Sequence, residues 1–359
     1  RVYNWGIFDF QQEDFLVRLL TGHMRYRLAV FSLRGTLRQY RAANRSVYVQ
    51  QLRLGPKERR ELQRRVQVNY LPENRRYDYD PYLDNCSTRV RDHLDRVLDG
   101  RLRTATGSVS TGRTWRSHTL RLLRRDFFPH LGLALGMGQP ADAEITAWEE
   151  MFLPLRMRER VRSLSVGTGV SGSAPLVSRE DTLYRASRPP APARAPDRTL
   201  WFLLASLLAG GSLGWSGRLS GSGSSRSRHL FGGLGVTWSL LAGVLGTLML
   251  AGWTLTDHWF LYRNENLLLA NPLFLALAPL VAMAAWRGGG RTLRRAARTL
   301  AWCLVGLGGA GALLQVLPGF DQVNALAVAI FLPLHLGLAV GLRSLEDGSE
   351  HGSRARQRE

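Results

Sequence analysis

Cysteine and lysine are nearly absent from this chain of 359 residues. Cys303 lies inside a hydrophobic run and Cys86 in the polar half, which excludes a disulfide between them and leaves Cys86 as a lone thiol. Lys57 is the only lysine, so the formal charge of +20 rests almost wholly on arginine. The chain starts at Arg1 without a leader, as expected of a fragment that begins inside a domain.

The arginine excess has two interpretations. A nucleic-acid-binding protein would place basic patches against phosphates, whereas a membrane protein would set them beside an anionic bilayer. The sequence has no zinc-ligand spacing, no RNA-binding aromatic signature and no recognition-helix pattern. We therefore favour the membrane interpretation and expect no nucleic-acid partner and no bound metal or cofactor.

Hydrophobic residues are concentrated in the second half of the chain. Leu, Ala, Gly, Val and Trp dominate residues 199–343, where small residues repeat in AGGSLG and GLGGAGA and would let helices approach closely. Five runs are each about long enough to cross a hydrocarbon core of ~30 Å at 1.5 Å per residue. These predicted spans of an all-α bundle are 200–216, 230–253, 267–286, 299–317 and 324–342.

Arginines mark one side of this predicted bundle. The loops after the first and third spans and the tail at 344–359 are basic, whereas the loops after the second and fourth spans carry one arginine and none. By the positive-inside rule the tail is cytoplasmic and the N-terminal domain lies on the outer side. The basic positions are Arg218, Arg226, Arg228, Arg287, Arg291, Arg294, Arg295, Arg298, Arg343, Arg354 and Arg356.

The first half has the mixed pattern of an α+β domain over residues 1–164. Alternating or short β-like runs predict strands, and apolar residues at helical spacing predict helices. A Gly/Ser-rich stretch, a short β-like stretch and a Pro-rich stretch follow one another at 165–198 and together predict an extended linker. The predicted strands cover 1–10, 28–33 and 47–54, and the predicted helices cover 57–69, 87–98, 115–128 and 144–164.

The segment LDNCSTRVRDHL places Cys86 where a thiol can be activated. Asp84 and Asn85 predict a helix N-cap, and a helix N-terminus with Arg89 and Arg91 nearby would stabilise a thiolate. The alternative, a small buried residue at a helix start, explains the same pattern. A cysteine nucleophile also needs a base.

No histidine in the sequence stands out as that base. His93 lies seven residues beyond Cys86 on the predicted helix, two turns away and too far along the axis. The remaining histidines of the first half, His23, His118 and His130, are isolated in sequence and are better explained as structural or surface residues.

Several blocks of the first half are distinctive: RVYNWGIFDF, FLVRLLTGHMRYRL, RSVYVQQLRL and NYLPENRRYDYDPYLDNCSTRVRDHL, followed by TWR at 114–116 and LGLALGMGQPADAEITAWEEMFLP at 131–154. Together they resemble the periplasmic domain of the Lnb family of bacterial lipoprotein N-acyltransferases, the last two being similar to its closing blocks. The resemblance covers about 1–160, and the PENRxYxYDxxxDNCxTR block is the most specific. The run TDHWFLYRNENLLLANPL at 256–273 resembles the family's outward-facing loop.

The resemblance implies a papain-like thiol fold of NlpC or LRAT type, with Cys86 as the nucleophile and Asp84, Asn85 and Arg89 in support. It implies a catalytic histidine in a strand upstream of Arg1. It also implies acyl transfer in the inner membrane of a Gram-negative bacterium. The acyl donor would be a membrane phospholipid, the intermediate a Cys86 thioester, and the acceptor the α-amino group of a diacylglyceryl-cysteine lipoprotein.

In the second half, Asp257, His258, Asn264 and Asn266 are candidates for binding a lipid headgroup or the acceptor amine, or belong to a solvated loop. His335 lies within the fifth predicted span, where an ionisable residue is either functional or hydrogen-bonded to a neighbouring helix.

Two alternative functions remain open on the sequence. A membrane-tethered thiol hydrolase, either an amidase or a lipid thioesterase, would use the same cysteine chemistry with water as the acceptor. A non-catalytic membrane scaffold would retain the thiol fold without activity.

Overall fold

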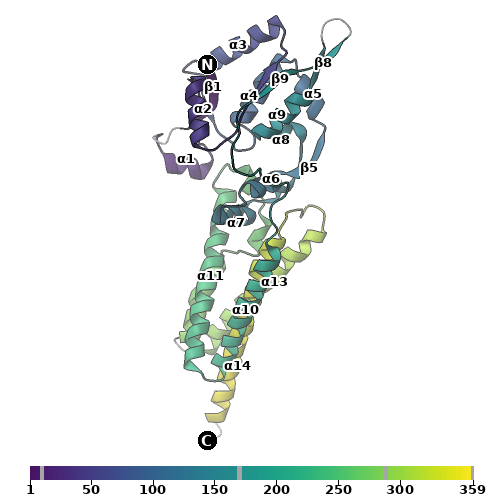
Figure 1. Ribbon diagram of the computed structural model, residues 1–359. Helices are drawn as coiled ribbons and strands as arrows, with labels where there is room; N and C mark the ends of the chain where they lie inside the picture. Colours follow the sequence, from purple (N-terminus) through teal and green to yellow (C-terminus); the bar gives the residue numbers. More distant parts are fainter. Residues whose placement is uncertain (9–11, 168–171, 287–289, 357–359) are drawn as a thin grey trace. The chain divides into compact units, whose positions relative to one another are not determined.

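The computed structural model (Figure 1) describes residues 1–8, 12–167, 172–286 and 290–356. These residues form two compact units. The first unit is Arg1–Trp115 with Glu144–Pro192, and the second is Arg116–Ala143 with Ala193–Glu359. The chain therefore combines an N-terminal α/β unit with a C-terminal helical unit.

A three-stranded antiparallel sheet in the first unit lies beside the helix that starts at Cys86, α4 (Cys86–Val97). Trp5, Leu28 and Tyr77 come one from each strand and form a buried cluster, against which Cys86 packs. The strand predicted at 1–10 is present over Val2–Phe8, and residues 9 and 10 lie outside the described residues. The strand predicted at 28–33 is shifted: it runs over Arg25–Phe31, and Ser32 caps the helix that starts at Leu33. In sheet order the strands are β1 (Val2–Phe8), β2 (Arg25–Phe31) and β4 (Arg76–Asp78).

A second apolar core packs α4 against neighbouring helices. Leu94, Leu98, Leu102 and Met151 are buried in it because apolar residues recur on α4 at helical spacing and continue into the next helix. The helices of this unit besides α4 are α1 (Phe15–Thr21), α2 (Leu33–Ala42), α3 (Pro56–Tyr70), α5 (Arg101–Thr106), α8 (Ala147–Glu150) and α9 (Pro154–Ser163).

The linker predicted at 165–198 is wrong over its first part. The strands β7 (Ser165–Gly167) and β8 (Ser173–Pro175) pair with each other, and β9 (Val177–Tyr184) pairs antiparallel with β3 (Val47–Leu52). Residues 168–171 lie outside the described residues. Pairing of β9 with β3, about 130 residues earlier in the chain, satisfies the backbone hydrogen-bonding groups of this polar segment. Composition alone did not reveal that partner.

The predicted helix at 144–164 is only partly correct. It contains β6 (Glu144–Thr146), which pairs with β5 (Ser110–Thr114), before the helices α8 and α9. Thr146 ends the strand and caps α8 through its side chain, and Pro154 starts α9 at a position where its missing N–H is not needed.

Residues 116–143 leave the first unit and fold with the second, so the N-terminal domain predicted over 1–164 is interrupted. The insertion carries α6 (Trp115–Leu122), α7 (Phe127–Gly136) and the short helix η1 (Gln139–Asp142). Arg116 holds the insertion together: its buried guanidinium pairs with Asp142 and donates to the carbonyls of Ala134 and Met137, all within residues 116–143. Nothing in the sequence indicated that Arg116 would pair with Asp142.

Within the described residues, four helices of the second unit are long and apolar enough to cross a membrane, where five spans were predicted. The third predicted span, 267–286, is helical as α12 only over thirteen residues, about 20 Å at 1.5 Å per residue. Its first part forms a turn around Pro272, which has no N–H to donate. The helices are α10 (Thr199–Gly221), α11 (Ser225–Thr254), α12 (Phe274–Trp286), α13 (Arg291–Leu313) and α14 (Ala325–Arg356).

The tail predicted at 344–359 continues α14 to Arg356, and 357–359 lie outside the described residues. Its cytoplasmic location stays a prediction, as does that of the basic loops.

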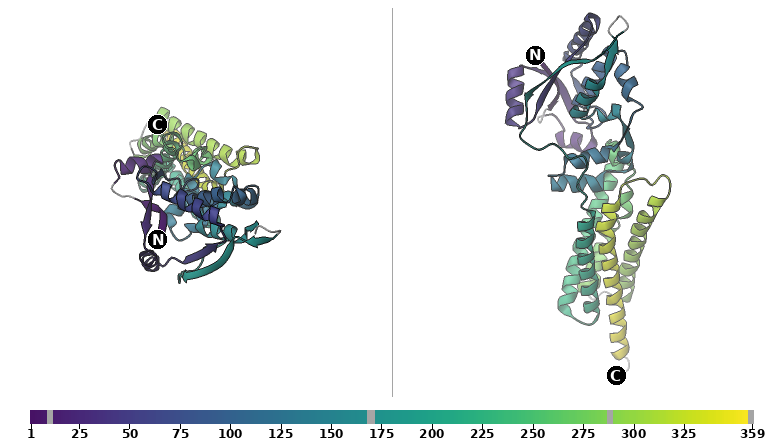
Figure 2. Two further views of the ribbon diagram at one scale, coloured as in Figure 1. Left: turned by 90° about the horizontal axis from the view of Figure 1, so that it is seen from above. Right: turned by 45° about the vertical axis from the view of Figure 1, so that its right-hand side comes forward.

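Glycines bring α10 and α14 into close contact, as the small-residue repeats predicted. The right view of Figure 2 shows the yellow α14 running along the bundle beside α10. A Cβ on Gly217 would lie 2.2 Å from the Cα of Gly341, and one on Gly210 would lie 2.3 Å from the Pro333 carbonyl oxygen. Because the contact is between backbones, only glycine fits at these positions.

His335 is fully hydrogen-bonded inside the second unit. Trp238 Nε1 donates to its Nδ1 at 3.1 Å, so the proton lies on Nε2, which donates to the Leu269 carbonyl at 3.0 Å. The interhelical hydrogen-bond interpretation therefore accounts for this residue.

Candidate active site

Asn85 holds Cys86 at the first position of α4. Its Oδ1 accepts hydrogen bonds from the N–H groups of Ser87 and Thr88, at 2.8 and 3.0 Å, and the Asn85 N–H donates to Thr88 Oγ1. Its Nδ2 donates to the carbonyls of Pro81 and Phe152. Asn85 is thus both an N-cap and a link between the helix start and two other segments.

The strand β1 passes directly beside the thiol. A Cβ on Gly6 would lie 3.6 Å from the Cys86 Cβ and 3.9 Å from its Sγ, an ordinary contact. Tyr26 and Tyr79, stacked at 4.0 Å between ring centroids, border the same aromatic cluster. The side chain of Cys86 therefore lies between the start of a helix and an aromatic sheet face.

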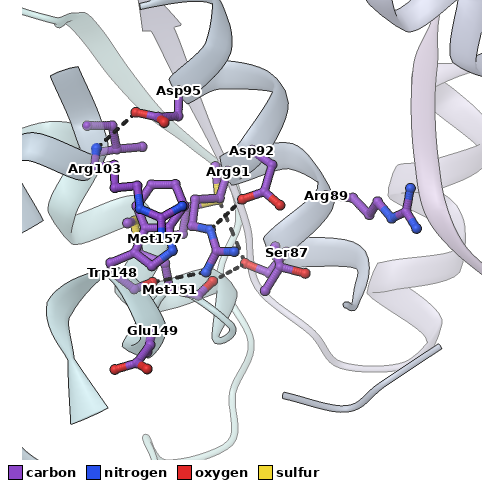
Figure 3. Close-up of polar contacts among 12 residues, drawn as sticks. Ser87, Arg89, Arg91, Asp92, Asp95, Arg103, Trp148, Glu149, Met151 and Met157 are labelled. Carbon is purple, nitrogen blue, oxygen red and sulfur yellow. Dashed lines mark hydrogen bonds and ion pairs between the residues drawn. The ribbon is translucent and has the colours of Figure 1, made fainter. Parts of the chain in front are cut away.

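The two arginines next to Cys86 do not supply free positive charge to it, contrary to the expectation. Arg89 forms a two-point ion pair with Asp84 and lies 4.3 Å above the Tyr77 ring. Arg91 pairs with Asp92 and donates to the Trp148 carbonyl (Figure 3), while Arg89 points away from that group. Asp84 and Arg89 instead brace the loop in front of the helix.

Burial raises the pKa of the Cys86 thiol above its ordinary value, and the N–H groups of Cys86 and Ser87 offset this only in part. Between pH 6 and the raised pKa, the alkylation rate of native Cys86 by iodoacetamide should rise about tenfold per pH unit. At each pH the alkylation rate should be lower for the folded chain than for the unfolded chain, because burial lowers the fraction of Cys86 present as thiolate. Measuring both rates in a Cys303→Ser background isolates Cys86, and a plateau below pH 8 would contradict this assignment.

An apolar cavity of about 470 Å³ opens beside the thiol, entirely within the first unit. Its volume falls in the range of small-molecule sites. α3, α4, α9, β1 and β3 all contribute walls, so no single stretch of sequence could have revealed it. The lining residues are Tyr3, Trp5, Gln50, Leu52, Leu62, Val66, Cys86, Ser87, Val90, His93, Leu94, Pro154, Met157, Arg158 and Val161.

His93 lines this same cavity, two helical turns or about 10 Å along the axis from Cys86. Its ring contacts Trp5 at 5.4 Å between centroids, and burial lowers its pKa, which keeps the imidazole neutral. No histidine among the described residues hydrogen-bonds to the Cys86 thiol. The rejection of His93 as the partner base rests on this same helical spacing and stays a prediction.

Two of the four polar residues predicted to bind lipid or substrate are structural. Asn264 and Asn266 are buried, and their amide groups donate to the Leu135 and Gly136 carbonyls at the end of α7. The free carbonyls at a helix end need such donors, which explains the burial of both asparagines. Asp257 is exposed and His258 half-buried, so these two remain candidates.

Residues 1–125 match the family model described as the Lnb N-terminal periplasmic domain. The resemblance to the Lnb family is confirmed for this region. No curated protein and no solved structure matches the chain. The match contains Cys86 and its cap, whereas the similar blocks at 131–154 and 256–273 lie beyond it. The chain therefore joins an Lnb-type periplasmic domain to a unit with several membrane-capable helices.

Proposed function

We propose that the chain is a membrane-bound N-acyltransferase that uses Cys86 to move a fatty acyl chain from a phospholipid to a lipoprotein. The observation that carries this proposal is the position of a helix-capped thiol on the wall of an apolar cavity. An apolar cavity suits a hydrocarbon chain, and the membrane-capable helices put the protein where such chains are found. A helix starting at the nucleophile and packed on an antiparallel sheet supports a papain-like fold.

The first step forms a thioester. Cys86 Sγ attacks the acyl carbonyl carbon of the phospholipid ester; the ester C–O bond breaks, and the thiol proton ends on the hydroxyl of the released lysophospholipid. In this proposal the N–H group of Cys86, at the first position of α4, stabilises the oxyanion, while the N–H of Ser87 is bound by Asn85 Oδ1. Because burial favours the protonated thiol, a base must accept that proton during the attack.

The second step consumes the thioester. The α-amino group of a diacylglyceryl-cysteine lipoprotein attacks the same carbonyl carbon, the C–S bond breaks, and a proton from the amine restores the Cys86 thiol. The product is an amide, which is more stable than the thioester. We place the N-terminal unit in the periplasm and the C-terminus of α14 in the cytoplasm, as the basic loops predict.

The test is capture of the intermediate. The full chain, purified in detergent and mixed with a phospholipid that carries an alkyne-tagged acyl chain, should gain a tag that hydroxylamine removes and that peptide mass spectrometry places on Cys86. A Cys303→Ser variant should be tagged equally, since Cys303 is an exposed residue of α13 outside this site. A tag that appears and is then lost to water without any acceptor would favour the thioesterase alternative. No tag at Cys86 would reject the proposal.

A further inference from the structure

The wall of the cavity next to Cys86 is largely apolar. Three of the polar side chains on its wall are already engaged elsewhere: Gln50 with Glu180, Ser87 with the Met151 carbonyl, and Arg158 with Glu180. His93 adds an imidazole whose Nδ1 is buried without a hydrogen-bond partner. An occupant with polar groups would lose its hydrogen bonds to water and gain few in return, so the cavity selects an apolar ligand.

The cavity extends along α4. Cys86, Val90, His93 and Leu94 follow one another at spacings of four, three and one, which places them along one face of the helix over about 12 Å. Val90 is 37% exposed although it lies on this apolar face. The helix therefore offers a strip that starts at the thiol and continues away from it, with Val90 one turn beyond the sulfur.

The volume of the cavity matches one acyl chain. At about 30 Å³ for each water-sized group, 470 Å³ holds about fifteen such groups, the bulk of a single long acyl chain. A ligand that enters here alongside the thiol is thus one hydrocarbon tail that ends at Cys86.

We infer that this cavity is the acyl-chain channel of the enzyme and that Val90 sets the length of chain the channel accepts. The inference rests on the proposed function, because it assumes that Cys86 carries the chain as a thioester. Leu62 and Val66 of α3 and Met157 of α9 form the side walls that surround the chain. Each buried methylene should favour longer chains by up to about fourfold.

The test compares chain lengths on one thiol. The probes are p-nitrophenyl esters with acyl chains of two to sixteen carbons, which acylate thiols without the natural donor. Mass spectrometry on the full chain follows the acylation of Cys86 by each ester. The wild type should prefer long chains. Val90→Trp, which fills the channel one turn beyond the sulfur, should lower the ratio of hexadecanoyl to butanoyl transfer at least tenfold while butanoyl transfer persists. Val90→Ala, which cannot block the channel, should keep the preference.

Val68→Trp is the matched control, since Val68 lies on α3 outside the cavity lining and is 44% exposed. It should leave the chain-length profile unchanged. If no ester of any length acylates Cys86, the proposed function fails. If all lengths react equally in the wild type, or if Val90→Trp leaves the profile unaltered while remaining folded by circular dichroism, the channel assignment fails and the function stands. Should Val90→Trp not fold, loss of the long-chain preference in Leu62→Trp decides the same question.

Discussion

Replacing Cys86 with serine is expected to lower lipoprotein N-acylation by at least about a thousandfold. Serine is nearly isosteric, so the helix cap of Asn85 and the contact with Gly6 are retained. Its hydroxyl is a far weaker acid than a thiol, and its oxygen a poorer nucleophile toward an ester. The effect should therefore fall on the chemistry and not on folding.

The measurement is mass spectrometry of lipoprotein N-termini from cells in which this chain is the sole N-acyltransferase. The serine variant should leave the α-amino group free, and the Cys303→Ser variant should retain the amide. Near-normal N-acylation by a serine or alanine variant of Cys86 would mean that the thiol is dispensable. The scaffold alternative would then be favoured, with the acyl transfer due to another protein.

Replacing Arg116 with leucine is expected to reduce the free energy of unfolding by about 3–5 kcal/mol. Its guanidinium is almost fully buried and is bound to both oxygens of Asp142, at 2.7 and 2.9 Å, and to the carbonyls of Ala134 and Met137. Without it, a buried carboxylate and at least two carbonyls would lose their partners. That loss exceeds the gain from burying a leucine.

Unfolding of the full chain in detergent, followed by circular dichroism, measures this change. Arg179→Leu provides the comparison, because Arg179 pairs with Asp181 on the surface and should contribute no more than about 1 kcal/mol. The double variant Arg116→Leu with Asp142→Leu should recover part of the lost stability, since it removes the unpaired charge. A change below 1 kcal/mol for Arg116→Leu alone would show that these contacts do not hold the insertion together.

The parts of this protein that the sequence predicted correctly depend on interactions between near neighbours. The cap at Asn85 requires only the three residues that follow it, and the helix from Cys86 follows from the apolar spacing of its own segment. The long apolar runs predicted α10, α11, α13 and α14 because a helix needs no distant partner to satisfy its backbone. The specific block around Cys86 was sufficient for the Lnb resemblance.

Only the tertiary structure decided what surrounds the thiol. The cavity is built from five elements that are distant in sequence, and burial against them raises the pKa of Cys86, whereas local charge suggested the opposite. Arg89 was expected to activate the thiol and is instead neutralised by Asp84. Likewise, β9 pairs with the distant strand β3, and the 116–143 insertion folds with residues from Ala193 onward. Local pattern determines where a helix begins, but the burial and pairing of a side chain are set by residues that fold next to it from elsewhere.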